Sequence, residues 1–152
     1  MPRRIFINSR ALSPKASIVN SATGLIPQAF PEVVATDKIQ YRFFLVDGLG
    51  NYDPITGDVT NYTVRLALGE TTTQTILTST NVFTSAPETV DGVVTAAWEG
   101  VLDCTVAPVL AAVGQARAVE YYMEFEVKET AGAGTIITYF QVPVQLRNRI
   151  LN

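Results

Sequence analysis

The strongest constraint on the fold is a strict alternation of apolar and polar side chains along residues 119–128. One face of this segment carries Val119, Tyr121, Met123, Phe125 and Val127, and the other carries Glu120, Tyr122, Glu124, Glu126 and Lys128. Successive side chains of a β-strand point to opposite faces, so the pattern predicts a half-buried strand. A loop with two glycines at 130–134 and a second alternating run over 135–147 predict that the chain returns as a hairpin.

The return strand contains a proline that restricts its place in a sheet. Its predicted inward face carries Thr138, Phe140, Val142, Val144 and Leu146. Proline has no backbone N–H, so Pro143 predicts either an edge position or a β-bulge at this point of the strand.

Other segments complete an all-β pattern. Further strands are predicted at 39–46, 62–68 and 93–103, with weaker candidates at 75–79 and 82–84. Together with the hairpin, they predict an antiparallel β-sandwich of about six to seven strands. We expect this β-sandwich domain to occupy residues 38–152, a length that suits one domain.

One short helix is predicted between the 93–103 strand and the hairpin. Thr105 is expected to cap it, Pro108 lies in its first turn, and Gly114 is expected to end it. The single tryptophan, Trp98, is predicted to anchor the core from the preceding strand.

The first 37 residues have a different character. Pro14, Gly24, Pro27 and Pro31 interrupt short apolar pieces. Because proline removes a hydrogen-bond donor, a central strand is not expected across this region, although residues 5–7 are a candidate for a short strand. Residues 1–37 are therefore predicted to form an extended N-terminal arm that lies either on its own domain or on a neighbouring copy.

Histidine is absent and cysteine occurs once, as Cys104. The chain therefore lacks the Ser-His and Cys-His pairs of many nucleophilic enzymes, the ligands of most zinc sites and an internal disulfide. We predict that the protein is not an enzyme, with no catalytic, cofactor-binding or metal-binding residues and no cofactor. Cys104 is predicted to be a small buried hydrophobic side chain.

Two groups of acidic residues have simple explanations. Glu120 and Glu124 are two strand repeats apart, or about 13 Å, which is wider than a glycosidase carboxylate pair. We therefore interpret the acidic side of the 119–128 strand as a solvated face. Acidic residues within 47–58 do not have the spacing of a calcium loop, so turn chemistry is the preferred interpretation.

Charge is distributed unevenly along the chain. The basic ends carry Arg3, Arg4, Arg10, Arg147 and Arg149, together with one lysine in the first 15 residues. Residues 16–146 hold all 14 acidic residues and five basic ones, a net charge of −9. The basic ends are predicted to contact the acidic body of a neighbouring copy in a homo-oligomer, the alternative being two solvated termini.

Three kinds of partner or destination are not expected. Six basic residues at two ends form no clustered patch for nucleic acid. No segment is long and apolar enough for a membrane span, and the N-terminus lacks the apolar core of a secretory signal. Without such a signal, we expect synthesis in the cytoplasm.

Two tyrosines are candidates for an exposed aromatic site. Tyr122 and Tyr139 are predicted on the outer faces of two strands that should pair. They are expected to form an interface patch or a sugar-stacking platform, with a plain cross-strand pair as the simpler interpretation. An alternative function is therefore a carbohydrate-binding or adhesion module that uses Trp98, Tyr122 or Tyr139.

The order of the pieces resembles the small β-sandwich virion proteins of tailed phages, in particular the N-terminal domain of the baseplate upper-protein type and tail-fibre-associated structural proteins. The resemblance rests on residues 41–47, 50–51, 62–69, 98–102, 138–141 and 147–151 and covers roughly 38–151. It transfers no catalytic residue. It implies a virion structural protein of the tail or baseplate, an assembly or adaptor subunit that joins receptor-binding fibres to the tail. Its implied partners are copies of itself and other virion tail or baseplate proteins.

Overall fold

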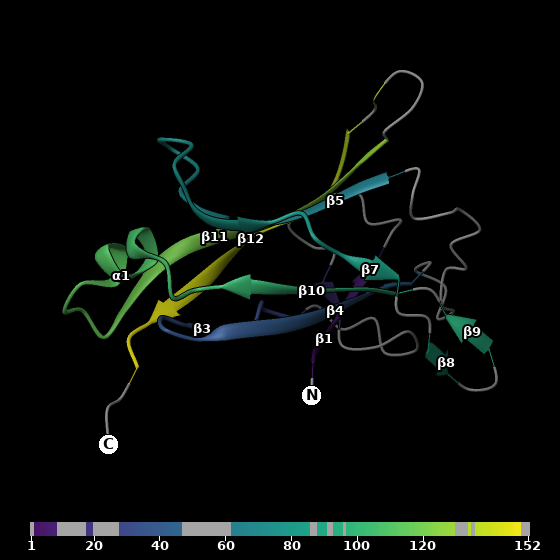
Figure 1. The fold of residues 1–152 in the computed structure, drawn as a ribbon, viewed down its shortest axis with the longest axis horizontal. Coiled ribbons are helices and arrows are strands. Elements are labelled where there is room, and N and C mark those ends of the chain that lie inside the picture. Colours follow the sequence, from purple (N-terminus) through teal and green to yellow (C-terminus); the bar gives the residue numbers. More distant parts are fainter. Residues whose placement is uncertain are drawn as a thin grey trace.

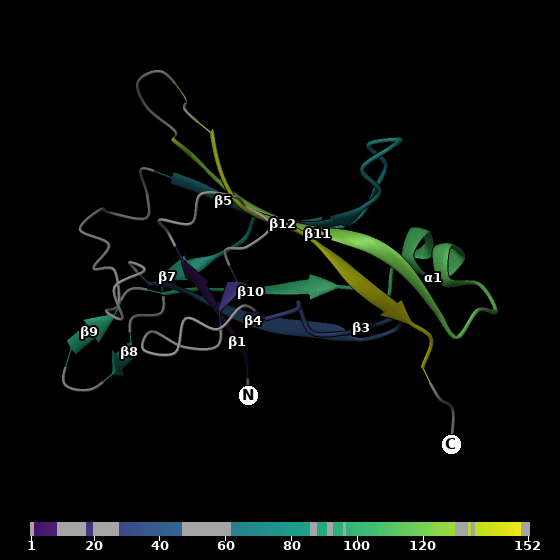
Figure 2. The same ribbon diagram turned by 180° about the vertical axis from the view of Figure 1, so that it is seen from behind.

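The computed structural model describes residues 2–8, 18–19, 28–46, 62–85, 88–90, 93–95, 97–129, 134 and 136–149. These residues form two facing β-sheets with one short helix (Figures 1 and 2). The predicted all-β, sandwich-like fold is confirmed, but the described residues form twelve strands and not six to seven, because several of them are only two or three residues long. The strand order is β2-β1-β4-β10-β7 in the first sheet and β3-β12-β11-β5-β6 in the second.

The elements have the following bounds. The first sheet contains β1 (Arg3–Asn8), β2 (Ile18–Val19), β4 (Lys38–Val46), β7 (Thr84–Ser85) and β10 (Ala97–Asp103). The second contains β3 (Val33–Val34), β5 (Tyr62–Gly69), β6 (Ile76–Thr80), β11 (Ala118–Glu129) and β12 (Ile136–Arg147). A separate hairpin pairs β8 (Glu88–Val90) with β9 (Val93–Thr95), and the helix is α1 (Ala107–Val113). Both views place α1 at one end of the sandwich, beside β11, and the β8–β9 hairpin at the other.

The described parts of residues 1–37 are extended and lie on their own domain. β1 pairs with β4 in parallel, and β3 pairs with β12 in parallel, whereas the other pairs of described strands are antiparallel. Ile7, Phe30 and Val33 are buried in the shared core. The candidate strand at 5–7 is confirmed as β1, but β1 lies between β2 and β4, so the expectation that this region holds no central strand is wrong. The prolines all lie outside β1 and so leave its backbone N–H groups free to pair. The parallel pairs also mean that the sandwich is not purely antiparallel.

Aromatic rings join the two sheets across the core. Phe43 of β4 stacks on Phe125 of β11 with their ring centroids 4.3 Å apart. Phe140 of β12 lies 5.7 Å from Phe125, and Trp98 of β10 lies 6.1 Å from it. Trp98 is buried, which confirms its predicted role as a core anchor.

A β-bulge interrupts the pairing of β11 with β12. Phe125 pairs with Phe140, but Glu126 pairs with Thr138, so Tyr139 is the extra residue on β12. The prediction that Thr138 faces inward is therefore wrong, because the bulge shifts the alternation by one residue. Among the described strands, Pro143 pairs with β11 alone, because β3 accompanies β12 only at its last two residues. β12 is an internal strand of the sheet, but Pro143 stands at a local edge, which agrees with the prediction.

The helix forms where the sequence predicts it, with a different cap. Val106 is the N-cap residue and makes no side-chain cap bond, so the prediction of Thr105 is wrong. The Thr105 amide and hydroxyl instead donate to Asp103 Oδ1 at 2.9 and 2.5 Å. The hydrogen bond from the Thr105 hydroxyl is the main reason why the pKa of the Asp103 carboxyl lies below its ordinary value, and the bond from the Thr105 amide adds to the effect. Gly114 ends the helix with a φ of +52°. Within the described residues, no helix has the length and apolar character needed to cross a membrane.

Candidate functional site

The terminal arginines contact groups of their own chain. Arg3 Nη1 donates to the Glu32 carbonyl oxygen at 2.6 Å, and Arg147 Nε lies 3.0 Å from Glu32 Oε2. Arg149 Nη1 lies 3.6 Å from Asp37 Oδ1. Arg10 lies outside the described residues. Docking on a neighbouring copy stays a prediction, but Arg147 and Arg149 already face acidic side chains of residues 1–37 in their own chain.

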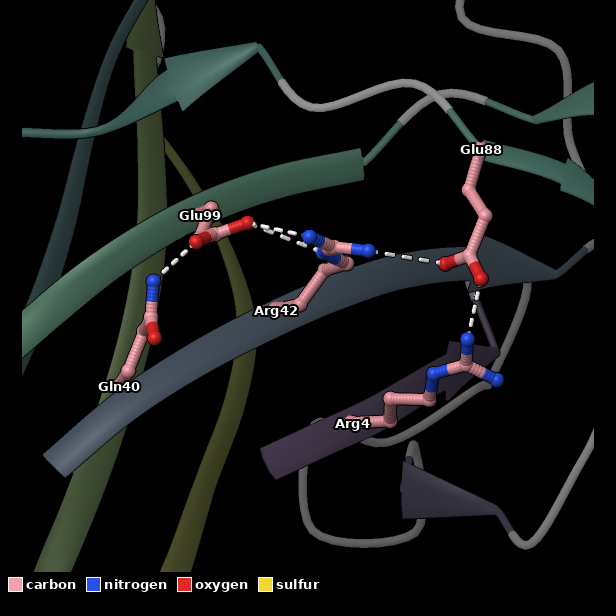
Figure 3. A network of polar contacts seen from close by, with 5 residues as sticks. All are labelled: Arg4, Gln40, Arg42, Glu88 and Glu99. Atoms are coloured by element: carbon pink, nitrogen blue, oxygen red, sulfur yellow. Dashed lines mark hydrogen bonds and ion pairs between the residues drawn. The ribbon is translucent and has the colours of Figure 1, made fainter. Parts of the chain in front are cut away.

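Arg4 belongs to a network on the outer face of the first sheet (Figure 3). At its centre, Arg42 of β4 donates to Glu99 Oε2 of β10 from Nε at 3.1 Å and from Nη2 at 2.6 Å. Arg42 Nη1 donates to Glu88 Oε2 at 3.1 Å. The other Glu88 oxygen accepts from Arg4, and the other Glu99 oxygen accepts from Gln40. Two arginines therefore balance two carboxylates across three strands and the start of β8.

This network ties the β8–β9 hairpin to the first sheet. Glu88 is the first residue of β8, and its two partners stand on β1 and β4. Nearby, the rings of Phe6 and Phe44 stack with centroids 5.2 Å apart, and the Arg4 guanidinium lies 5.8 Å from the Phe44 ring centroid. The two arginines and two carboxylates of this network pair with one another, so we interpret the network as structural: it holds the β8–β9 hairpin against the first sheet.

Replacing Glu88 with glutamine is expected to loosen the hairpin while the sandwich stays folded. The amide side chain loses the charge that holds Arg4 and Arg42, at a cost of about 1 kcal/mol for a partly exposed pair. Hydrogen exchange of the backbone amides at 88–90 and 93–95 should become faster. The matched control is Glu120→Gln, which alters an exposed carboxylate of the second sheet. Unchanged exchange in Glu88→Gln would show that the ion pairs do not hold the hairpin.

The structure does not bring the two candidate tyrosines together. Tyr122 pairs with Pro143 on one side and Gly69 on the other. Tyr139 occupies the bulge, and its ring centroid lies 6.2 Å from that of Phe125, against the core. Trp98 is only 4% exposed. The predicted cross-strand pair is therefore wrong, and Tyr122 alone remains as an aromatic platform on an outer face.

Tyr122 lines a depression on the outer face of the second sheet. Its volume is about 360 Å³, and its walls come from β5, β11, β12, the β5–β6 turn and Ile76 at the start of β6. Besides Tyr122, its polar lining includes Arg65, Glu70, Gln74, Glu124 and Gln141. The sequence pattern predicts Tyr122 on an outer face but does not predict the depression, because the residues that line it meet only through the strand register.

The second sheet also has an open edge. β6 is its last strand and is paired with β5 on one side only among the described strands. Its five residues include no charged residue and no proline. Two apolar side chains lie at the ends of this strand. Ile76, its first residue, is 49% exposed, and Val82, which follows it, is 74% exposed.

The acidic residues of β11 make ordinary surface contacts. Gln141 Nε2 donates to Glu124 Oε2 at 2.9 Å, and Arg65 Nη1 lies 3.2 Å from Glu126 Oε1. Over the part of the chain that the structure describes, no three acidic or cysteine side chains gather as metal ligands. The acidic loop at 47–58 lies outside that part.

No protein-family model matches the sequence, and no curated protein matches it.

Proposed function

We propose that this protein is a structural subunit of a phage tail or baseplate, an assembly or adaptor subunit that links receptor-binding fibres to the tail. Two things support the proposal. The order of strands, short helix and closing hairpin resembles small virion β-sandwich proteins. The observation that carries the assembly role is the uncharged, open edge of β6.

An open edge strand is a template for another strand. Among the described strands, none pairs with the second side of β6, although β10 and α1 lie close to it. Natural proteins usually protect such edges with charge, proline or a covering helix or loop. β6 carries neither charge nor proline, and exposed Ile76 and Val82 extend the apolar surface at its two ends. A neighbouring strand that pairs with β6 gains main-chain hydrogen bonds and apolar contact at once. The charged network of the first sheet is satisfied internally, so β6 is the better candidate contact.

Light scattering over a range of protein concentrations and salt tests this contact. We expect wild-type protein to form a defined oligomer. The oligomer of the double variant Ser79→Lys/Val82→Lys should have a smaller mass. Each copy would carry two added positive charges at the β6 edge, and these charges would repel the same charges on a neighbouring copy. The matched control, Val101→Lys/Gln145→Lys, adds the same charge at two exposed positions away from the edge. It should keep the wild-type mass.

The outcomes separate the contact from the biological role. A wild-type protein that is monomeric at every concentration contradicts self-assembly, and equal masses for all three proteins contradict a role for β6. Mass spectrometry of purified virions that carry this gene tests the virion assignment. We expect the chain to be present, and its absence from intact particles would overturn the assignment.

A further inference from the structure

We propose that the depression beside Tyr122 is a binding site for a neutral saccharide. This site adjoins the β6 contact, because Ile76 at the start of β6 also lines the depression, but Tyr122 and Gln141 belong to the depression alone. The depression lies on the outer face of the second sheet. Figure 1 shows the β5–β6 turn standing off that sheet. Its volume of about 360 Å³ falls at the lower end of the range for small-molecule sites.

The hollow results from a mismatch of side-chain size between paired strands. Tyr122 and Glu124 of β11 lie opposite Gly69 and Ala67 of β5. Gly69 and Ala67 have little or no side chain to fill the space opposite Tyr122 and Glu124. One side of the Tyr122 ring therefore lies next to Gly69, which has no side chain to cover it. Tyr122 is partly buried, which fixes the ring and limits the entropy lost on binding.

The turn that forms the end wall is held in place by the same glycine. A Cβ atom on Gly69 would lie 2.6 Å from the Thr75 carbonyl oxygen, so only glycine permits this close approach. The Glu70 amide donates to that oxygen at 2.8 Å and closes the turn. Gln74, also in the lining, has a φ of +55°, a conformation uncommon outside glycine and often found at ligand-binding positions.

The chemistry of the lining favours a polyol. An aromatic face accepts the C–H face of a sugar ring, and planar amide and carboxylate groups bind neighbouring hydroxyls. Gln141 and Glu124 hold each other through their 2.9 Å hydrogen bond, so both groups are oriented in advance. This combination of one ring and fixed planar polar groups is present here on rigid strands.

The charges favour a neutral sugar over an anionic one. Glu70 and Glu124 both line the depression, and its one basic group, Arg65, is paired with Glu126. A phosphate or a carboxylated sugar would meet two carboxylates with little compensating positive charge. Neutral hexoses and N-acetylhexosamines carry no such penalty.

A glycan array of neutral and anionic oligosaccharides, followed by calorimetric titration of the best neutral glycan, tests the site. Lactose, maltotriose and diacetylchitobiose serve as soluble probes. We expect binding of at least one neutral glycan and an affinity about tenfold weaker in Tyr122→Ala, from loss of the aromatic contact. Gln141→Ala should also weaken binding, whereas Gln145→Ala, on the same face of β12 but outside the depression, should bind like wild type.

A conservative variant and three possible results test whether the saccharide site exists. Tyr122→Phe keeps the ring and should keep most of the affinity, which separates a lost contact from a misfolded variant. The site is overturned if no neutral probe binds at about 10 mM, the weak limit for a specific site. Preference for anionic glycans, or binding that survives Tyr122→Ala combined with Gln141→Ala, overturns it as well. The oligomer mass of Tyr122→Ala should match wild type, so the result is distinguishable from failure of the β6 contact.

Discussion

Replacing Phe125 with alanine is expected to lower the free energy of unfolding by about 3–5 kcal/mol. The side chain is fully buried and stacks on Phe43 of the opposite sheet at a centroid distance of 4.3 Å. It also contacts Trp98 and Phe140, so its removal leaves a cavity bordered by both sheets. Since single domains are stable by only about 5–15 kcal/mol, such a loss takes a large share of the total.

Urea denaturation with linear extrapolation measures this loss. The matched control is Ile137→Ala in the same hairpin, where the side chain is 46% exposed and the cost should stay below about 1 kcal/mol. Phe125→Leu, which fills most of the cavity, should lie between the two. A cost for Phe125→Ala as small as that of the control would mean that this ring does not join the sheets.

The strands predicted most accurately are those in which local alternation decides burial. Met123, Phe125 and Val127 of β11 are buried, as the sequence pattern predicts. The pattern failed at Thr138, because a bulge is a property of the pairing between two strands. The local run Ile136-Ile137-Thr138-Tyr139 has no alternation that marks the shift.

The short strands and the depression depend on partners distant in the sequence. β3 is two residues long and pairs with the last residues of β12, more than 100 positions away. No local signal specifies such a parallel pair, and its stability comes from burial of Val33 in the common core. The depression likewise requires the register that places Tyr122 beside Gly69. The distribution of charge along the sequence predicts basic ends, but it does not predict that Glu32 and Asp37 lie beside the C-terminal arginines.

The protein is expected to lose stability steeply in alkali. Burial raises the pKa of the Cys104 thiol from 9.0 to about 12, and the charges of Asp103 and Asp37 add to this effect. Burial likewise raises the pKa of the Tyr41 phenol above its ordinary value of 10.0, and Arg3 opposes the change only in part. Both groups are neutral when protonated, so the folded state holds protons that the unfolded chain releases.

The direction of the pH dependence follows from proton binding. The folded pKa of each group is above its unfolded value, so the stability that each contributes is complete below about pH 9 and disappears as the pH rises toward 12. While a group is ionised only in the unfolded state, the free energy of unfolding falls by about 1.4 kcal/mol per pH unit. Equilibrium urea denaturation at intervals between pH 7 and pH 11 measures this slope, with a reducing agent present to keep the thiol intact.

The double variant Tyr41→Phe/Cys104→Ala isolates the contribution of the two buried groups, because every other side chain is the same in the variant and in wild type. Its stability relative to wild type should stay constant up to about pH 8.5 and then increase with pH, because the variant has lost the two groups that penalise the folded state in alkali. Each single variant should show part of this change, with the thiol's part beginning at lower pH. A difference from wild type that stays the same from pH 7 to pH 11 would contradict the burial of these two side chains as protonated groups.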